Sequence, residues 1–148
     1  MAGPGVGKVE FLSDGWIEAF RAVIAECFAA AGDESSPRNA TLLSESYTGV
    51  PSHIAASGSR GFSIRMREGV PSLHAEVDPS AMVRIAGEYQ SMLPVSRFDS
   101  RGEPAKAQEM NAMFGGLIAS GKAQATGAFD SLPAWIGGLH DRIAARTA

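Results

Sequence analysis

Apolar side chains recur at helical spacing in four stretches of this chain, and at alternate positions in others. The first helical stretch ends before Gly32, and Ser13 or Asp14 is placed to cap its start. Its apolar positions are Trp16, Ile17, Phe20, Val23, Ile24, Cys27 and Phe28. They form one broad stripe, which is typical of a helix that packs on a core.

The clearest strand pattern covers residues 62–77. Apolar and polar side chains alternate on both sides of the Glu68-Gly69 pair, and glycine readily takes the positive φ of a two-residue turn. Such a turn pairs Ile64 with Leu73, so that both apolar sets lie on the same side of an antiparallel hairpin. Pro71 lacks an N–H, which places its strand at an edge of the sheet or makes its start irregular.

Two further segments, residues 41–49 and 121–127, are predicted to be strands, and residues 53–56 are a candidate short one. The strand at 41–49 presents three side chains on one face: Leu43, Glu45 and Tyr47. Its opposite face carries Leu42, Ser44 and Ser46. The strand at 121–127 is bounded by glycines and lies between two predicted helices.

The remaining helical patterns cover residues 82–93, 110–118 and 132–143. Asp78-Pro79 is typical of a helix start, and Pro94 of a helix end. Pro104 can open the second of these helices, and Asp130 or Ser131 can cap the third. The element order is then helix, strands, helix, helix, strand, helix. It predicts an α+β domain with helices on one face of a largely antiparallel sheet.

Glycine pairs interrupt two of these helical patterns, at Gly115-Gly116 and Gly137-Gly138. Each glycine weakens a helix interior by roughly 0.5–1 kcal/mol relative to alanine. The pairs indicate either mobile helices or the close approach of another part of the protein to the backbone.

Composition narrows the classes of function. A chain of 148 residues, 45% of them hydrophobic and 20% charged, is expected to form one soluble domain, residues 11–148, after a mobile N-terminus, residues 1–10. The net charge of −3 gives no basic surface for nucleic acid. One cysteine excludes an internal disulfide, and no apolar run is long enough for membrane insertion. With no secretory signal in residues 1–10, a cytoplasmic protein is expected.

No motif in the sequence predicts catalysis. The segment 3–8 resembles a phosphate-binding loop, but Val9 stands where serine or threonine should bind magnesium. His74, Glu76 and Asp78 alternate along one strand, and a solvated sheet face explains them better than a metal site does. We therefore predict no catalytic residue, no metal site and no cofactor.

The order of elements resembles the sterol carrier protein 2-like family. The opening residues 11–17, the strand and glycine turn at 62–69, and the strand leading into the helix at 82–93 each look like parts of that fold. Residues 113–130 resemble its lid helix and final strand, and residues 132–143 its closing helix. The resemblance implies an α+β fold in which four to five helices cover one face of a single five-stranded sheet, largely antiparallel or mixed.

The resemblance also implies non-enzymatic binding or carriage of a lipid, such as a sterol, a fatty acid or an acyl-CoA. The ligand would occupy a hydrophobic cavity between the sheet and the helices, open beneath the helix at 110–118. Candidate ligand-binding residues come from the predicted inward faces: Phe20, Phe28, Phe62, Ile64, Met82, Ile85, Met110, Met113, Phe114, Leu117, Trp135, Ile136 and Leu139.

Two alternatives remain open at this point. An accessory subunit, or a homodimer, would cover an exposed apolar patch with an enzyme partner or a second copy. An enzyme acting on a steroid-like or polyketide substrate would need an ionisable group inside the cavity with a strongly shifted pKa. The sequence offers four candidates for that group: His74, Glu76, Glu45 and Asp130.

Overall fold

A computed structural model describes residues 7–31 and 36–148 of the chain. The expected end of the first helix at Gly32, and the expected mobility of residues 1–6, lie outside the described residues. Val9, within the N-terminal stretch, hydrogen-bonds to the Arg146 carbonyl and to the Ala148 amide, both at 2.8 Å. The N-terminal and C-terminal segments therefore run side by side.

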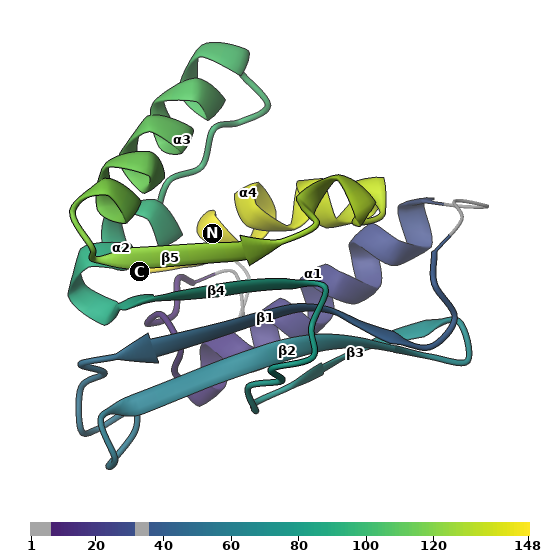
Figure 1. Cartoon of the computed structure of the whole chain (residues 1–148), viewed down its shortest axis with the longest axis horizontal. Coiled ribbons are helices and arrows are strands. Elements are labelled where there is room, and N and C mark those ends of the chain that lie inside the picture. The colour runs from purple at the N-terminus through teal and green to yellow at the C-terminus, as the bar shows by residue number, and fades with distance from the viewer. Residues whose placement is uncertain (1–6, 32–35) are drawn as a thin grey trace.

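The core of the fold is one mixed five-stranded sheet in the order β3-β2-β1-β4-β5 (Figure 1). Its strands are β1 (Ala40–Thr48), β2 (Ser59–Arg67), β3 (Val70–His74), β4 (Val83–Glu88) and β5 (Ala123–Gly127). The central pair, β1 and β4, is parallel, and every other neighbouring pair is antiparallel. The predicted α+β class and single sheet of five strands are confirmed, and the sheet is mixed.

The hairpin of β2 and β3 follows the sequence pattern. Ile64 pairs with Leu73, and the turn residues Glu68 and Gly69 take φ values of 51° and 80°. The strand β3 lies at an edge, as Pro71 requires, and it ends at His74, before the end of the alternating pattern. The candidate short strand at 53–56 is wrong, because residues 51–58 close a series of hydrogen-bonded turns instead.

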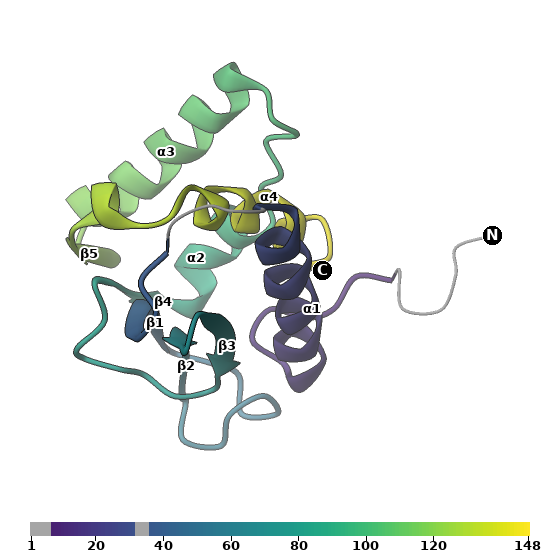
Figure 2. The same cartoon turned by 90° about the vertical axis from the view of Figure 1, so that its right-hand side faces the viewer.

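The first helix, α1 (Asp14–Ala31), is also as predicted. The hydroxyl of Ser13 accepts a hydrogen bond from the Trp16 amide at 3.2 Å, which satisfies one of the free N–H groups at the helix start. Six of its apolar residues are buried against the rest of the molecule: Trp16, Ile17, Phe20, Val23, Ile24 and Cys27. Helix α1 lies on the same side of the sheet as the C-terminal helices (Figure 2).

The helix predicted at 82–93 is wrong over its first half, which forms β4. Asp78 does not cap a helix: its carboxylate accepts hydrogen bonds from Ser80 and from Thr41, which fixes a turn. Val83 and Ile85 then add to the sheet beside β1, where the parallel pairing overrides a helical pattern. Only α2 (Tyr89–Ser96) is helical, and it continues two residues beyond Pro94.

The helix predicted at 132–143 is also wrong as a single element. Residues Ala134–Gly138 form the 3₁₀ segment η2, and only α4 (Leu139–Ala144) is α-helical. A separate 3₁₀ segment, η1 (Phe129–Ser131), comes before them. Leu132 has an extended ψ of 143° because it precedes Pro133, and this residue pair cannot continue a helix.

Helix α3 (Pro104–Ala119) forms as predicted but stands away from the body of the molecule (Figure 1). None of its residues is buried, and its contacts are with α2 and β5. Gly115 and Gly116 lie inside this continuous helix, and a Cβ at either position would have no atom within 4 Å. Close approach of another segment therefore does not explain this glycine pair.

Candidate functional site

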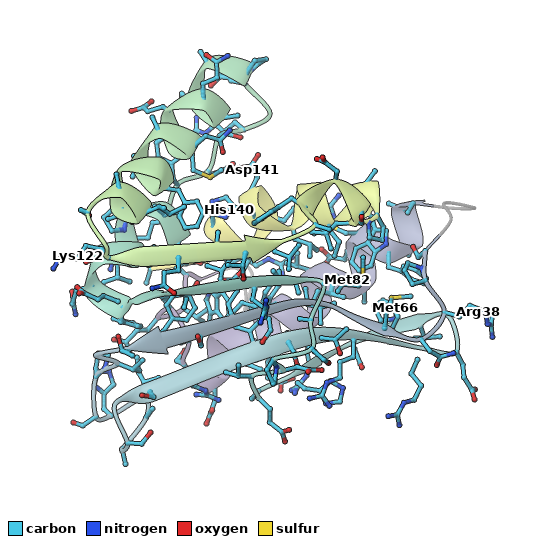
Figure 3. All side chains as sticks on the ribbon, in the orientation of Figure 1. Arg38, Met66, Met82, Lys122, His140 and Asp141 are labelled. Atoms are coloured by element: carbon cyan, nitrogen blue, oxygen red, sulfur yellow. The ribbon has the colours of Figure 1, made fainter. Side chains whose placement is uncertain are left out.

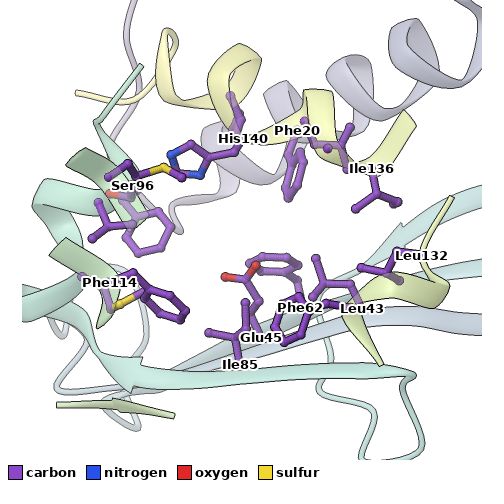
Figure 4. Close-up of a pocket in the computed structure, with 18 of the residues that line it drawn as sticks. Phe20, Leu43, Glu45, Phe62, Ile85, Ser96, Phe114, Leu132, Ile136 and His140 are labelled. Carbon is purple, nitrogen blue, oxygen red and sulfur yellow. The ribbon is translucent and has the colours of Figure 1, made fainter. Parts of the chain in front are cut away.

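A cavity of about 500 Å³ lies between the sheet and the helices. Its floor is formed by side chains of β1, β2 and β4, and its other walls by α1, α2, α3, η2 and α4. Figure 4 shows Phe62 and Ile85 from the sheet on one side, with Phe20 and Ile136 from the helical layer on the other. The structure thus has a cavity between its sheet and its helices.

Aromatic rings make up one wall of this cavity. Trp16 contacts Phe20 at a centroid separation of 5.1 Å and Phe62 at 5.5 Å. Phe11 lies edge-on to Trp16 at 5.0 Å and to Tyr47 at 5.1 Å. Because the rings hold one another in tilted and edge-to-face contacts, this wall is preformed.

The cavity reaches the surface beside α3. Asn111 on α3 is exposed, Phe129 is 48% exposed, and both line the cavity. Ile118, also on α3, is 42% exposed. The opening therefore lies between α3 and the segment that follows β5.

The predicted ligand-binding residues divide into two groups. Those that line the cavity are Phe20, Phe62, Ile85, Met110, Phe114, Ile136 and Leu139. Those that lie elsewhere are Phe28, Ile64, Met82, Met113, Leu117 and Trp135. Phe28 and Trp135 instead contact each other, with their ring centroids 5.6 Å apart. The Trp135 indole donates a hydrogen bond to the Ser36 hydroxyl. Ile64 is fully buried within the core.

One carboxyl group projects into this apolar cavity. Glu45 lies on the inward face of β1, and Figure 4 shows its carboxyl group directed toward the cavity centre. Tyr47, two residues along the same strand and 2% exposed, donates a hydrogen bond to Glu45 Oε1. Burial raises the pKa of Glu45 to about 7, and the hydrogen bond from Tyr47 opposes part of that rise.

Across the cavity from Glu45, His140 projects from α4 (Figure 4). Its Nε2 lies 3.0 Å from the Phe98 carbonyl oxygen, to which it can donate a hydrogen bond. Burial lowers the pKa of His140, so the ring is neutral at neutral pH. Figure 3 shows that its neighbour Asp141 points away, and that carboxylate accepts hydrogen bonds from Ser100.

The other ionisable candidates lie outside the cavity. His74 hydrogen-bonds with Ser72 on the polar face of β3, and Glu76 pairs with Arg65. Asp130 is exposed on η1. The part of the chain that the structure describes contains no group of three or more potential metal ligands.

Several lining residues were not among the sequence candidates. Phe11 precedes the first helix, Tyr47 shares the inward face of β1, and His140 lies in the divided C-terminal helix. For Tyr47 the signal was present, because alternation placed it on one face with Leu43 and Glu45. For His140 there was none, because residues 134–138 wind as a 3₁₀ helix, and this gives the residues that follow a different phase from that of a single α-helix.

Comparisons with known proteins give a resemblance in fold. No protein-family model matches the chain, and no curated protein matches it in sequence. Among solved structures, a conserved hypothetical protein of Thermus thermophilus, described as possibly a sterol carrier protein, is 16% identical with a TM-score of 0.48, over 95% of this chain and 90% of that chain.

Two further solved structures are similar over most of the chain. Palmitated SCP2L2 from Aedes aegypti is 15% identical with a TM-score of 0.43, over 88% of this chain and 94% of that chain. UbiJ-SCP2, a ubiquinone synthesis protein, is 14% identical with a TM-score of 0.40, over 84% and 76%. All three structures carry a sterol carrier protein or SCP2 description, and the likeness of this chain to them concerns the fold alone. None of the described helices could cross a membrane.

Proposed function

We propose that this protein binds an apolar small molecule of the lipid or sterol kind in the cavity between its sheet and helices, without transforming it chemically. The observation that carries this proposal is the cavity itself, about 500 Å³ in volume with walls of aromatic and aliphatic side chains. Ligand-binding cavities typically measure about 300–1,000 Å³ and combine apolar walls with a few polar groups. The sequence resemblance to a family of lipid carriers points the same way.

Burial of apolar surface would supply the affinity. Transfer of an alkyl chain from water into such walls contributes about 0.8 kcal/mol for each buried methylene, which is about fourfold in affinity. Among alkyl alcohols of increasing length, the affinity should therefore rise about fourfold with each added methylene, until the alkyl chain fills the cavity.

The first test is binding of diphenylhexatriene, a hydrocarbon probe that fluoresces when it enters an apolar site. We expect saturable binding at one probe per chain. Ile85→Trp fills the cavity from β4 and should reduce the affinity at least about tenfold, since the added ring takes the place of the probe. Arg84→Trp is the matched control, because Arg84 is exposed and adjacent on the same strand.

Native mass spectrometry of the purified protein, followed by denaturing extraction, complements this assay. A bound lipid at a ratio near one to one would name the ligand class. An absence of probe binding to the unmodified protein, together with a clean apo mass, would reject the proposal. Equal losses of binding in Ile85→Trp and Arg84→Trp would show that the probe does not occupy this cavity.

Glu45 favours one second candidate, an enzyme that moves a proton on an apolar ketone. A carboxyl group with a pKa of about 7 suits a general base. Such a reaction also needs a donor for the developing oxyanion, whereas Tyr47 donates to Glu45 and His140 Nε2 is placed on the Phe98 carbonyl. Conversion of a β,γ-unsaturated steroid ketone to its conjugated isomer, followed by ultraviolet absorbance and abolished in Glu45→Gln, would establish this candidate.

A further inference from the structure

The cavity walls carry an acidic side chain without a matching basic one. Among the described residues, Glu45 is the one acid on these walls, and no lysine or arginine lines them. Oε1 of Glu45 accepts the hydrogen bond from Tyr47, and no described side chain or amide donates to Oε2. An oxygen that can accept a hydrogen bond therefore faces the space where a ligand would lie.

The Glu45 side chain is only partly buried, and Oε2 is not among the described buried polar atoms that lack a partner, so water can reach it in the open cavity. A ligand that fills the cavity would displace this water, and an acceptor that loses its water without gaining a donor costs free energy. A ligand group that donates a hydrogen bond would recover that cost. A ligand carboxylate would instead place a second negative charge beside Glu45, where no described cation offsets it. The same side chain thus attracts one class of head group and repels another.

On the premise of the proposed function, we propose that Glu45 selects among apolar ligands by their head group. It favours a head that donates a hydrogen bond, as a hydroxyl or an ammonium group does, and it disfavours an ionised carboxylate. Glu45 acts here as a specificity-determining residue. Tyr47 acts as a positioning residue, because its hydroxyl donates to Oε1 and so leaves Oε2 as the acceptor available to a ligand.

The selection should depend on pH. Near pH 6 most Glu45 carboxyls carry a proton, because their pKa is about 7, and they can themselves donate to a ligand carboxylate. Above pH 8 they are ionised and only accept. The other titratable groups on the cavity walls are Tyr47 on β1 and His140 on α4. The described side chains that α1, α2, α3, β2 and β4 present to the cavity are uncharged.

Three probes with one alkyl chain test this inference: dodecanol, dodecylamine and dodecanoic acid, each displacing diphenylhexatriene from the full chain. At about pH 8.5 we expect the acid to bind at least about tenfold more weakly than the alcohol, and the amine to bind at least as tightly as the alcohol. At about pH 6 the difference between acid and alcohol should narrow to within about threefold.

Glu45→Gln should remove the discrimination, bringing acid and alcohol within about threefold of each other at both pH values. Glu76→Gln is the matched control, since Glu76 is exposed outside the cavity and its change should alter neither ratio. Tyr47→Phe provides a second readout if Glu45→Gln fails to fold. The hydrogen bond from Tyr47 lowers the pKa of Glu45, so its loss should raise that pKa. The pH at which dodecanoic acid begins to bind more weakly should then shift upward.

The outcomes separate the two proposals. If diphenylhexatriene binds but acid and alcohol compete equally at about pH 8.5, or if Glu45→Gln leaves their ratio unchanged, head-group selection is overturned while the binding function stands. A pH dependence that persists in Glu45→Gln would assign it to His140 and would also overturn the inference. If neither diphenylhexatriene nor any of the three amphiphiles binds, the proposed function fails and the inference with it.

Discussion

The indole of Trp16 donates a 3.0 Å hydrogen bond to the hydroxyl of Thr147, which donates in turn to the Ile143 carbonyl at 2.7 Å. Trp16 and Thr147 are 3% and 2% exposed. Because the Trp16 ring also lines the cavity, this bond ties one cavity wall to the C-terminal segment. The two residues are 131 positions apart in the sequence, and only the fold brings them together.

Thr147→Val should lower the free energy of unfolding by about 1–3 kcal/mol, because it leaves the buried indole N–H without an acceptor while keeping the shape of the side chain. Urea unfolding followed by fluorescence measures the change. Thr48→Val, at an exposed position at the end of β1, is the control and should stay within about 0.5 kcal/mol of the unmodified protein. Similar effects of the two substitutions would argue against the Trp16–Thr147 bond.

Gly115→Ala and Gly116→Ala should each stabilise α3 by about 0.5–1 kcal/mol. The added methyl group meets no neighbouring atom, and alanine gives the unfolded chain fewer conformations than glycine does. Hydrogen exchange of the α3 amides measures local opening directly. Gly127→Ala is the opposing control. Gly127 has a φ of 114°, and a Cβ there would meet the Met82 carbonyl, so this change should destabilise. Faster α3 exchange in Gly115→Ala would contradict the prediction.

Glu45 should make the protein less stable as the pH rises. Burial raises its pKa from 4.5 to about 7, so between these values the folded protein retains a proton that the unfolded chain has lost. The free energy of unfolding therefore falls across this window, by at most about 3 kcal/mol, and levels off above it. Glu45→Gln should remove this contribution and should be more stable than the unmodified protein above pH 7.

The measurement is the difference in unfolding free energy between the two proteins over the pH range, since the difference cancels the other titrating groups. His140 and Asp78, whose pKa values are lowered by folding, contribute slopes of the opposite sign. A constant difference between pH 4.5 and 7 would show that the pKa of Glu45 is not raised.

Ser80→Ala should raise the pKa of Asp78. Hydrogen bonds from the Ser80 hydroxyl, then from Thr41 and the Ser80 amide, hold that pKa at about 2, below its usual 3.8. The stability from this carboxylate is present above pH 3.8 and lost as the pH falls through about 2. A carbon-detected NMR titration of the carboxyl group follows the change. Ser120→Ala is the control: the Ser120 hydroxyl donates to the Leu117 carbonyl, and its removal should leave the pKa of Asp78 unchanged.

Local pattern was sufficient for the elements whose pairing or burial is decided within a few residues. Alternation about the Glu68-Gly69 turn gave the Ile64–Leu73 pair, because a two-residue loop leaves one register that puts both apolar sets on one side. The same period of two placed Glu45 on one face of β1 with Leu43 and Tyr47, and the structure shows that this face lines the cavity. The stripe that begins at Trp16 likewise defined α1.

Longer-range pairing decided what the pattern could not. Val83 and Ile85 suit a helix face or a strand equally well in a short apolar run, and their place beside β1 follows from a parallel pairing with residues some forty positions earlier. In the C-terminal stretch the apolar spacing did not distinguish a 3₁₀ segment from an α-helix: η2 begins after the extended Leu132 and Pro133, and only α4 is α-helical.

By itself, the sequence determined that this is an α+β protein with one sheet, that Phe62 belongs to an inward face, and that Glu45 shares a face with Leu43 and Tyr47. Only the tertiary structure decided which inward residues surround the cavity and which fill the core: Phe20 lines the cavity, whereas Phe28, two turns further along the same helix, packs on Trp135. The reason is physical. Periodicity reports that a side chain leaves water, but a cavity and a close-packed core are equally apolar, and the distance between the elements that face each other makes the difference.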